Sequence, residues 1–197
     1  MRHGHTDLNA LHEVHGRIDD PLDERGLAQA AALGQLFEGF PLSAVYASPL
    51  QRAVQTAEPV AAATGLTVVA DPDLMDRDYG PWTGHVKAEV EAEFGAVDNA
   101  PGVEPWDSFS ERVTAAFLVL ATRHAGEMVA VTAHDAVNQA VLGRLVPGRW
   151  PGPHAIPQRN GCWNNVERAA PLSTEWPSWV LHVLDAVPGD GNLPPGY

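Results

Sequence analysis

The amino-acid sequence predicts an α/β protein, a three-layer α/β/α sandwich in which helices cover both faces of a mainly parallel sheet. Short apolar runs rich in β-branched residues, which are typical of buried strands, alternate with longer segments whose apolar residues recur at helical spacing. Parallel strands need long crossover connections, which are usually helices. The alternation therefore favours a parallel sheet that is buried between two helical layers.

The first half of the chain contains two expected strands. Residues 26–37 carry Leu and Ala at helical spacing and predict an amphipathic helix. The apolar run 43–47 suits a buried strand, and a helix then opens with Ser48 as its N-cap and Pro49 in its first turn. The β-branched run 66–70 is the second expected strand. This order of strand, helix and strand is that of a parallel unit.

The second half continues the same alternation of helices and strands. The expected elements are helices over 85–94, 109–124 and 136–146, and strands over 128–132, 161–166 and 179–184. Asp107 or Ser108 is expected to cap the second of these helices. Residues 147–157 are dense in Pro and Gly and are expected to form a surface connection.

Two polar side chains directly follow expected strands. Arg52 comes after the strand over 43–47, and His134 comes after the strand over 128–132. In parallel sheets, ligands bind at the carboxyl ends of the strands. The sequence therefore predicts that Arg52 and His134 share one site, although they are far apart along the chain.

The composition indicates one folded domain. At 197 residues, with 45% hydrophobic and 19% charged residues, the chain has ordinary globular usage. We expect a single domain over residues 1–187 and a disordered tail over residues 188–197.

The charge balance limits the possible partners. Lys and Arg total 12 against 25 Asp and Glu, which gives a formal net charge of -13. Such a chain repels polyanions unless it has a basic patch, and no run of Lys or Arg is present. We therefore expect neither nucleic acid nor a membrane surface as a partner, and a few focused cations must bind any small phosphorylated substrate.

The single cysteine, Cys162, cannot form an internal disulfide and fits a reducing compartment. No apolar stretch approaches the ~20 residues that a membrane span needs, and the amino terminus has no signal-peptide pattern. A cytoplasmic protein is expected. The sequence gives no indication of oligomeric state.

Four separated motifs carry the chemistry, and they occur in a specific order. They are Arg2-His3-Gly4, the stretch 48–57, the stretch 74–84 and the stretch 132–135. Together they resemble the histidine phosphatase superfamily, also called the phosphoglycerate mutase-like superfamily, from Arg2 to about residue 166. The resemblance implies a phosphoglycerate mutase-like fold.

The resemblance also implies functions for individual residues. His3 matches the histidine that becomes phosphorylated, Arg2 and Arg52 match the phosphate-binding arginines, and His134 matches the second catalytic histidine. Asp76 falls where this branch usually has a glutamate proton donor. Asp135 is the alternative donor, because in the acid-phosphatase branch an Asp directly follows the second histidine. We prefer Asp76 and place Asp135 among the substrate-binding residues.

Physical chemistry supports these residue types. A neutral imidazole is a good nucleophile, and flanking cations disfavour its protonated form, so Arg2 and Arg52 are expected to keep His3 neutral. The arginines also donate paired hydrogen bonds to phosphate, which needs positioning and charge stabilisation without a metal. No metal or other cofactor is therefore expected.

Three further residues near the amino terminus are expected to contribute to substrate binding. Gly4 permits a close approach of the backbone. Thr6 and Asn9 either donate hydrogen bonds to the phosphate or only cap the loop that contains them.

The main functional hypothesis is a phosphomonoesterase that hydrolyses a small phosphorylated metabolite through a phosphohistidine on His3. One alternative is a cofactor-dependent phosphoglycerate mutase, in which Arg77, Tyr79 and Lys87 would bind the substrate carboxylate. Against it, residues 89–106 contain no Lys or Arg, whereas the mutases carry an arginine pair there. The other alternative is a non-catalytic protein that binds phosphorylated ligands. The physiological alcohol is not predicted.

The amino terminus departs from the family pattern. In the family the Arg-His-Gly motif follows a buried apolar strand, but here Met1 directly precedes Arg2. We expect the first strand to be missing and the nucleophile to be loosely held. A misplacement of ~1 Å can lower a rate about a hundredfold, so a chain extended upstream by a strand is expected to be more active or more stable.

Overall fold

A computed structural model gives the structure of residues 1–169 and 178–190. The expected disordered tail over 188–197 lies largely outside the described residues. Among the described residues, no helix combines the length and the apolar character needed to cross a bilayer.

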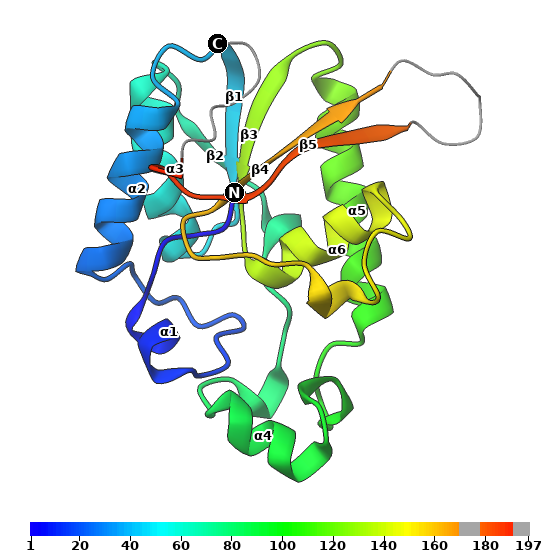
Figure 1. The fold of residues 1–197 in the computed structure, drawn as a ribbon. Helices are drawn as coiled ribbons and strands as arrows, with labels where there is room; N and C mark the ends of the chain where they lie inside the picture. Colours follow the sequence, from blue (N-terminus) through cyan, green and yellow to red (C-terminus); the bar gives the residue numbers. More distant parts are fainter. Residues whose placement is uncertain (170–177, 191–197) are drawn as a thin grey trace.

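The central sheet contains three parallel strands in the order β2-β1-β3. These are β1 (Leu42–Ala47), β2 (Val68–Ala70) and β3 (Met128–Thr132). The parallel sheet predicted from the sequence is thus confirmed, and the bounds of β3 are those predicted. The late strands β4 (Trp163–Arg168) and β5 (Trp179–Ala186) form an antiparallel pair beside it (Figure 1).

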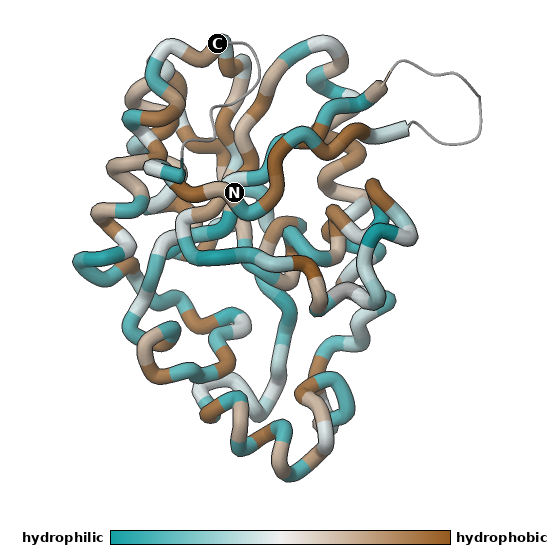
Figure 2. Tube along the Cα trace, in the orientation of Figure 1, coloured by the Kyte–Doolittle hydropathy of each residue, from teal (hydrophilic) through white to brown (hydrophobic). Residues whose placement is uncertain are grey.

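Helices cover both faces of this sheet, as the three-layer prediction requires (Figure 1). On one face lie α2 (Glu24–Leu36) and α3 (Gln51–Ala63), whose apolar residues pack on β1 and β3. On the other face lie α5 (Trp106–Arg123) and α6 (Asp135–Leu145). Figure 2 shows hydrophobic residues along β3, whose residues are buried or half-buried between these layers.

Two shorter helices lie beyond the carboxyl ends of the parallel strands (Figure 1). They are α1 (Asp7–Leu11) and α4 (Lys87–Phe94). Backbone hydrogen bonds join the two regions, since the Lys87 N–H donates to the His12 carbonyl at 3.0 Å and the Gly84 N–H donates to the Val14 carbonyl at 2.8 Å. These segments therefore enclose the edge at which the sequence predicts a site.

Two predicted helix starts are wrong. Helix α3 begins at Gln51, with Leu50 as its N-cap, so Ser48 is not the cap. The Ser48 hydroxyl instead hydrogen bonds to His134. Helix α5 begins at Trp106 after Pro105, so its first turn contains the residues expected to cap it. The Trp106 ring packs on the core between α5 and α6, which favours the earlier start.

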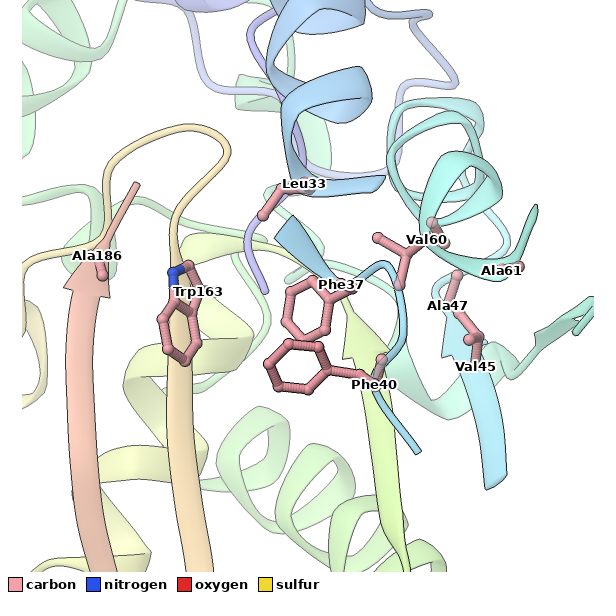
Figure 3. Close-up of a cluster of buried hydrophobic side chains, with 11 residues drawn as sticks. Leu33, Phe37, Phe40, Val45, Ala47, Val60, Ala61, Trp163 and Ala186 are labelled. Carbon is pink, nitrogen blue, oxygen red and sulfur yellow. The ribbon is translucent and has the colours of Figure 1, made fainter. Parts of the chain in front are cut away.

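A hydrophobic core cluster joins helices α2 and α3, the central sheet and the β4–β5 pair. Trp163 of β4 lies opposite Phe37 and Phe40, and Val45 and Val60 lie beyond them (Figure 3). The Trp163 ring is 2% exposed and meets the Phe37 ring edge-on, with centroids 6.1 Å apart. Aromatic pairs prefer such an arrangement. This contact links β4 to the carboxyl end of α2.

The edge of β3 that faces away from β1 is largely open. A cavity of about 1040 Å³ lies there, and its lining includes β3 residues Met128–Val131 and β4 residues 163–168. Within the described residues, no strand fills the space between β3 and β4. The cavity therefore lies between β3 and β4.

Residues 1–3 are nevertheless anchored on both sides at the end of this cavity. On the β3 side, the Met1 ammonium donates to the Val131 carbonyl at 2.6 Å. The Ala133 N–H donates to the Met1 carbonyl at 3.0 Å, and the His3 N–H donates to the Ala133 carbonyl at 2.9 Å. Toward β4, the Arg2 N–H donates to the Cys162 carbonyl at 2.9 Å, and Gly161 donates to the His3 carbonyl at 3.0 Å. The expectation of a loosely held nucleophile is therefore wrong for the backbone of residues 1–3.

Candidate active site

His3 lies at the centre of the predicted site. Its side chain is buried, and Nδ1 is 2.7 Å from the Gly4 carbonyl oxygen. A carbonyl can only accept, so Nδ1 carries the proton and Nε2 has a free lone pair. The His3 ring is 5.3 Å from the His134 ring and 6.0 Å from the His15 ring, centroid to centroid. The nucleophilic nitrogen is thus available within a cluster of imidazoles.

Burial and two arginines keep His3 neutral. Burial lowers the pKa of His3 well below its ordinary value, and the charges of Arg52 and then Arg2 lower it further. Both effects disfavour the charged imidazolium. The sequence analysis anticipates the arginines, but burial, which only the fold reveals, is the larger cause.

Arg52 is fully buried in the floor of the site. Its Nη1 donates to the Asp20 carboxylate at 2.7 Å and to the Ile18 carbonyl at 2.6 Å. Its Nη2 donates to the Gly16 carbonyl at 2.9 Å and to Asp76 at 3.3 Å. The guanidinium is therefore held by four hydrogen bonds. Its positive charge lowers the pKa of both His3 and His134.

His134 follows β3, as predicted, and is fully buried. Its Nε2 is 2.9 Å from the Ser48 hydroxyl oxygen, and its buried Nδ1 has no hydrogen-bond partner. Burial and the charge of Arg52 lower the pKa of His134 well below its ordinary value. If the Ser48 hydroxyl donates to Nε2, the proton of the neutral ring lies on Nδ1, which is 3.7 Å from Asp76.

The two candidate proton donors lie in different environments. Asp76 is 4% exposed, and burial raises its pKa to about 7 against the opposing charge of Arg52. The Asp135 side chain is 45% exposed. Burial alone would raise the pKa of Asp135, but Arg2 and the Ala136 N–H together lower it. Asp76 is therefore the carboxyl that can hold a proton near neutral pH.

Arg2 also acts on His3 and is held by partners of its own. Its Nη2 is 3.9 Å from the Asp135 carboxylate, and its Nη1 donates to the Gln158 carbonyl. Its Nε is buried without a partner. Arg2, Arg52, Asp76 and His134 thus surround His3, and the structure brings together all the main predicted residues.

The three other predicted binding residues have structural partners. The Gly4 N–H donates to Thr56 at 2.9 Å, and a Cβ on Gly4 would lie 2.7 Å from the Gly26 carbonyl oxygen. Thr6 and Asn9 form a capping box at the start of α1, which is one of the two alternatives expected for them. Direct contact of these three residues with substrate stays a prediction.

Sequence reasoning missed two members of the site, Ser48 and His15. Ser48 belongs to a quoted motif, but only the tertiary structure shows that it orients His134. His15 accepts a hydrogen bond from the Asn9 amide at 3.1 Å and lies 3.5 Å from Asp20. Burial, followed by the charge of Arg52, lowers the pKa of His15 to about 4. The loop that contains His15 has no periodic pattern that could have indicated this.

The sequence matches the family model of the histidine phosphatase superfamily (branch 1) over residues 1–171. The chain therefore belongs to this superfamily, and it is a phosphatase.

Relatives and solved structures agree with this assignment. The chain is 32% identical over 160 residues to phosphoglycerate mutase-like protein 4 of Arabidopsis thaliana. This match covers 75% of this chain and 70% of that protein. It is 34% identical over 159 residues to a metal-independent phosphoserine phosphatase of the same plant, with coverage of 74% and 66%. The solved structure of mycobacterial hydrolase 1 superposes with a TM-score of 0.85 at 25% identity, covering 94% of this chain and 96% of that one.

Proposed function

We propose that the chain is a phosphomonoesterase that hydrolyses a small phosphorylated metabolite through a phosphohistidine on His3. The observation that carries the proposal is the state of His3, a buried neutral imidazole whose Nδ1 is occupied by Gly4 and whose Nε2 is free. Enzymes activate nucleophiles in this way, by holding them unprotonated beside groups that stabilise developing charge.

In the first step, the Nε2 lone pair attacks phosphorus and the bond from phosphorus to the alcohol oxygen breaks. Asp76, whose pKa of about 7 leaves it partly protonated, transfers its proton to the departing oxygen. Arg2, Arg52 and the His134 Nδ1–H stabilise the charge on the transferring phosphoryl group. These groups need no metal, and we expect a chelator to leave the rate unchanged.

In the second step, water attacks the phosphohistidine. The Asp76 carboxylate takes a proton from this water, phosphate leaves, and His3 regains its lone pair at Nε2. The same carboxyl thus acts first as acid and then as base. The relatives that are named phosphatases support hydrolysis as the outcome.

The test is to trap the intermediate with p-nitrophenyl phosphate. We expect an acid-labile, alkali-stable phosphate on His3, and His3→Ala should abolish both this adduct and hydrolysis. His182→Ala is the matched control, because His182 pairs with Glu167 on the surface of the β4–β5 pair. An unchanged rate in His3→Ala would contradict the mechanism.

Two outcomes would favour the alternatives. Strict dependence on 2,3-bisphosphoglycerate, together with isomerisation of 3-phosphoglycerate, would indicate a mutase. Ligand binding without turnover in the wild type would indicate a non-catalytic binding protein.

We also propose a cytoplasmic location, which the single buried cysteine, Cys162, supports.

A further inference from the structure

The outer wall of the site, defined here as residues 77–106 together with the loop 12–20, lies next to the catalytic groups. The wall begins at Arg77, whose N–H donates to the Asp76 carboxylate at 2.9 Å. The loop supplies the Gly16 and Ile18 carbonyls that receive Arg52. The wall therefore lies beside the residues that would hold a phosphate ester at His3.

Tyr79 is one part of the wall that comes within electrostatic range of the site, and Lys87, whose charge acts on Asp135, is another. Burial raises the pKa of Tyr79, and the charges of Asp76 and Asp135 raise it further. The Arg77 guanidinium lies 5.7 Å from the centre of the Tyr79 ring. Arg77 is thus the wall cation that lies against the Tyr79 ring.

Arg77 is neutralised by Asp98. Its side chain is 2% exposed, Nη1 donates to the Asp98 carboxylate, and Nε donates to the Glu104 carbonyl at 2.8 Å. The guanidinium also lies 5.4 Å from the centre of the Trp106 ring. Arg77 therefore already has a carboxylate partner, and a substrate carboxylate would have to compete with Asp98 for it.

The other cations of the wall, and Arg112 of α5 behind it, also have acidic partners. Arg17 lies 3.6 Å from Asp78 and 3.7 Å from Glu104. Arg112 lies 3.3 Å from Glu104. Lys87 lies 3.7 Å from Glu91, in an exposed pair. Within the described part of the chain, the wall therefore offers a substrate no cation without an acidic partner.

We propose that this wall selects phosphomonoesters whose alcohol portion carries no carboxylate, and that the Arg77–Asp98 pair enforces the selection. The inference rests on the proposed phosphatase function. A substrate carboxylate would have to displace Asp98 from Arg77 or remain unpaired beside it, and both situations are unfavourable. An uncharged, hydroxyl-bearing alcohol meets neither obstacle.

Glycerol 3-phosphate and 3-phosphoglycerate are a matched pair of probes. They share a three-carbon skeleton and differ at one end, which is a hydroxymethyl group in the first and a carboxylate in the second. We expect kcat/KM of the wild type to be at least tenfold higher for glycerol 3-phosphate. An equal or higher value for 3-phosphoglycerate would overturn the inference.

Asp98→Asn tests the pair directly by freeing Arg77. We expect kcat/KM for 3-phosphoglycerate, relative to glycerol 3-phosphate, to rise about tenfold. Asp98 also pairs with His154 at 3.1 Å. Glu167→Gln is the matched control, because it likewise removes one negative charge and one pair with a histidine, His182, but on the surface of β4. An equal change of the ratio in both variants would assign the discrimination to net charge and overturn the function given to Asp98.

A second variant covers the case in which Asp98→Asn does not fold. Lys87→Gln should leave the ratio within about twofold, because the inference gives Lys87 no contact with a substrate carboxylate. A tenfold loss for 3-phosphoglycerate alone would show that Lys87 binds carboxylates and would overturn the inference.

Calorimetry separates this inference from the proposed function. His3→Ala should bind glycerol 3-phosphate more tightly than 3-phosphoglycerate, whether or not the wild type hydrolyses either compound. Tighter binding of 3-phosphoglycerate would overturn the selection, whereas absence of wild-type hydrolysis with the expected order of binding would overturn only the phosphatase mechanism.

Discussion

The two edges of β3 differ sharply. On the β1 side, five parallel residue pairs run from Leu42–Met128 to Ala47–Thr132. On the other side, among residues 1–169 and 178–190, residues 1–3 alone make backbone hydrogen bonds to β3 and Ala133, and a cavity of about 1040 Å³ lies between the rest of β3 and β4. His134 follows the carboxyl end of β3, and His3 hydrogen bonds to Ala133 there.

This difference shows that catalytic geometry and sheet stability have separate sources in this protein. The catalytic groups are positioned by buried hydrogen bonds at one end of β3, in which Arg52 and His134 take part. The open edge lies along residues 128–131 of β3, where the cavity reduces packing contacts. It does not include the residues of the candidate site. Changes at the carboxyl end should therefore affect the rate, and changes along the open edge should affect the free energy of unfolding.

The largest effect is expected at the carboxyl end, from Asp76→Asn. Loss of a general acid typically lowers a rate 10²–10⁴-fold. We expect kcat for glycerol 3-phosphate to fall about 10³-fold, but kcat for p-nitrophenyl phosphate to fall less than about tenfold, because p-nitrophenolate leaves without a proton. Asp135→Asn is the control, and the same pattern in that variant would assign the donor to Asp135.

The next largest effect is expected at the open edge, from Trp163→Ala. Replacing a buried Trp by Ala usually lowers the free energy of unfolding by 3–5 kcal/mol. We expect about 3 kcal/mol in urea denaturation, because Trp163 also lines the cavity and its indole N–H has no partner. Val180→Ala, at a half-exposed position of β5, should cost less than about 0.5 kcal/mol. A loss below about 1 kcal/mol in Trp163→Ala would show that β4 contributes little to the core.

Filling the cavity should give a smaller effect of opposite sign. A chain extended before Met1 by an apolar strand of about six residues can pair with β3 and β4 and bury apolar surface. We expect the Tm to rise by about 5 °C, whereas kcat should change less than about twofold because residues 1–3 are already anchored. An extension of Gly and Ser of equal length is the control, and an equal Tm for the two would contradict the prediction.

The smallest effect concerns pH. The pKa of Asp76 is raised to about 7, so the protonated donor is present below this pH and is lost above it. We therefore expect kcat/KM for glycerol 3-phosphate to fall about tenfold per pH unit above this value. Asp76→Asn should remove this alkaline limb, and its persistence in that variant would assign the limb to another group.

Much of the fold could be predicted because its signals are local. The β-branched run of β3 and the helical spacing of α2 depend only on neighbouring residues, and both elements were found within a few residues of their predicted positions. The start of α3 after Ser48 and the start of α5 before Asp107 could not be predicted, because both depend on contacts with residues that are distant along the chain. Ser48 bonds to His134, and Trp106 packs against α6.

The candidate site was predictable as a set of residues but not as an arrangement. The motifs around His3, Arg52, Asp76 and His134 are visible in the sequence, and the topology of a parallel sheet predicts that two of them share an edge. The location of His15, the exposure that separates Asp76 from Asp135, and the neutralisation of Arg77 by Asp98 all depend on contacts between segments that are distant along the chain.

By itself, the sequence determined which residue types the candidate site contains: a histidine proposed as the nucleophile, two arginines, a second histidine and two candidate proton donors. The tertiary structure alone decided their protonation and their access to substrate. The physical reason is that a pKa depends on burial and on the charges nearby, and both are properties of the folded molecule rather than of any short segment. For this reason the pKa of the same residue type, Asp, is raised at position 76 and lowered at position 135.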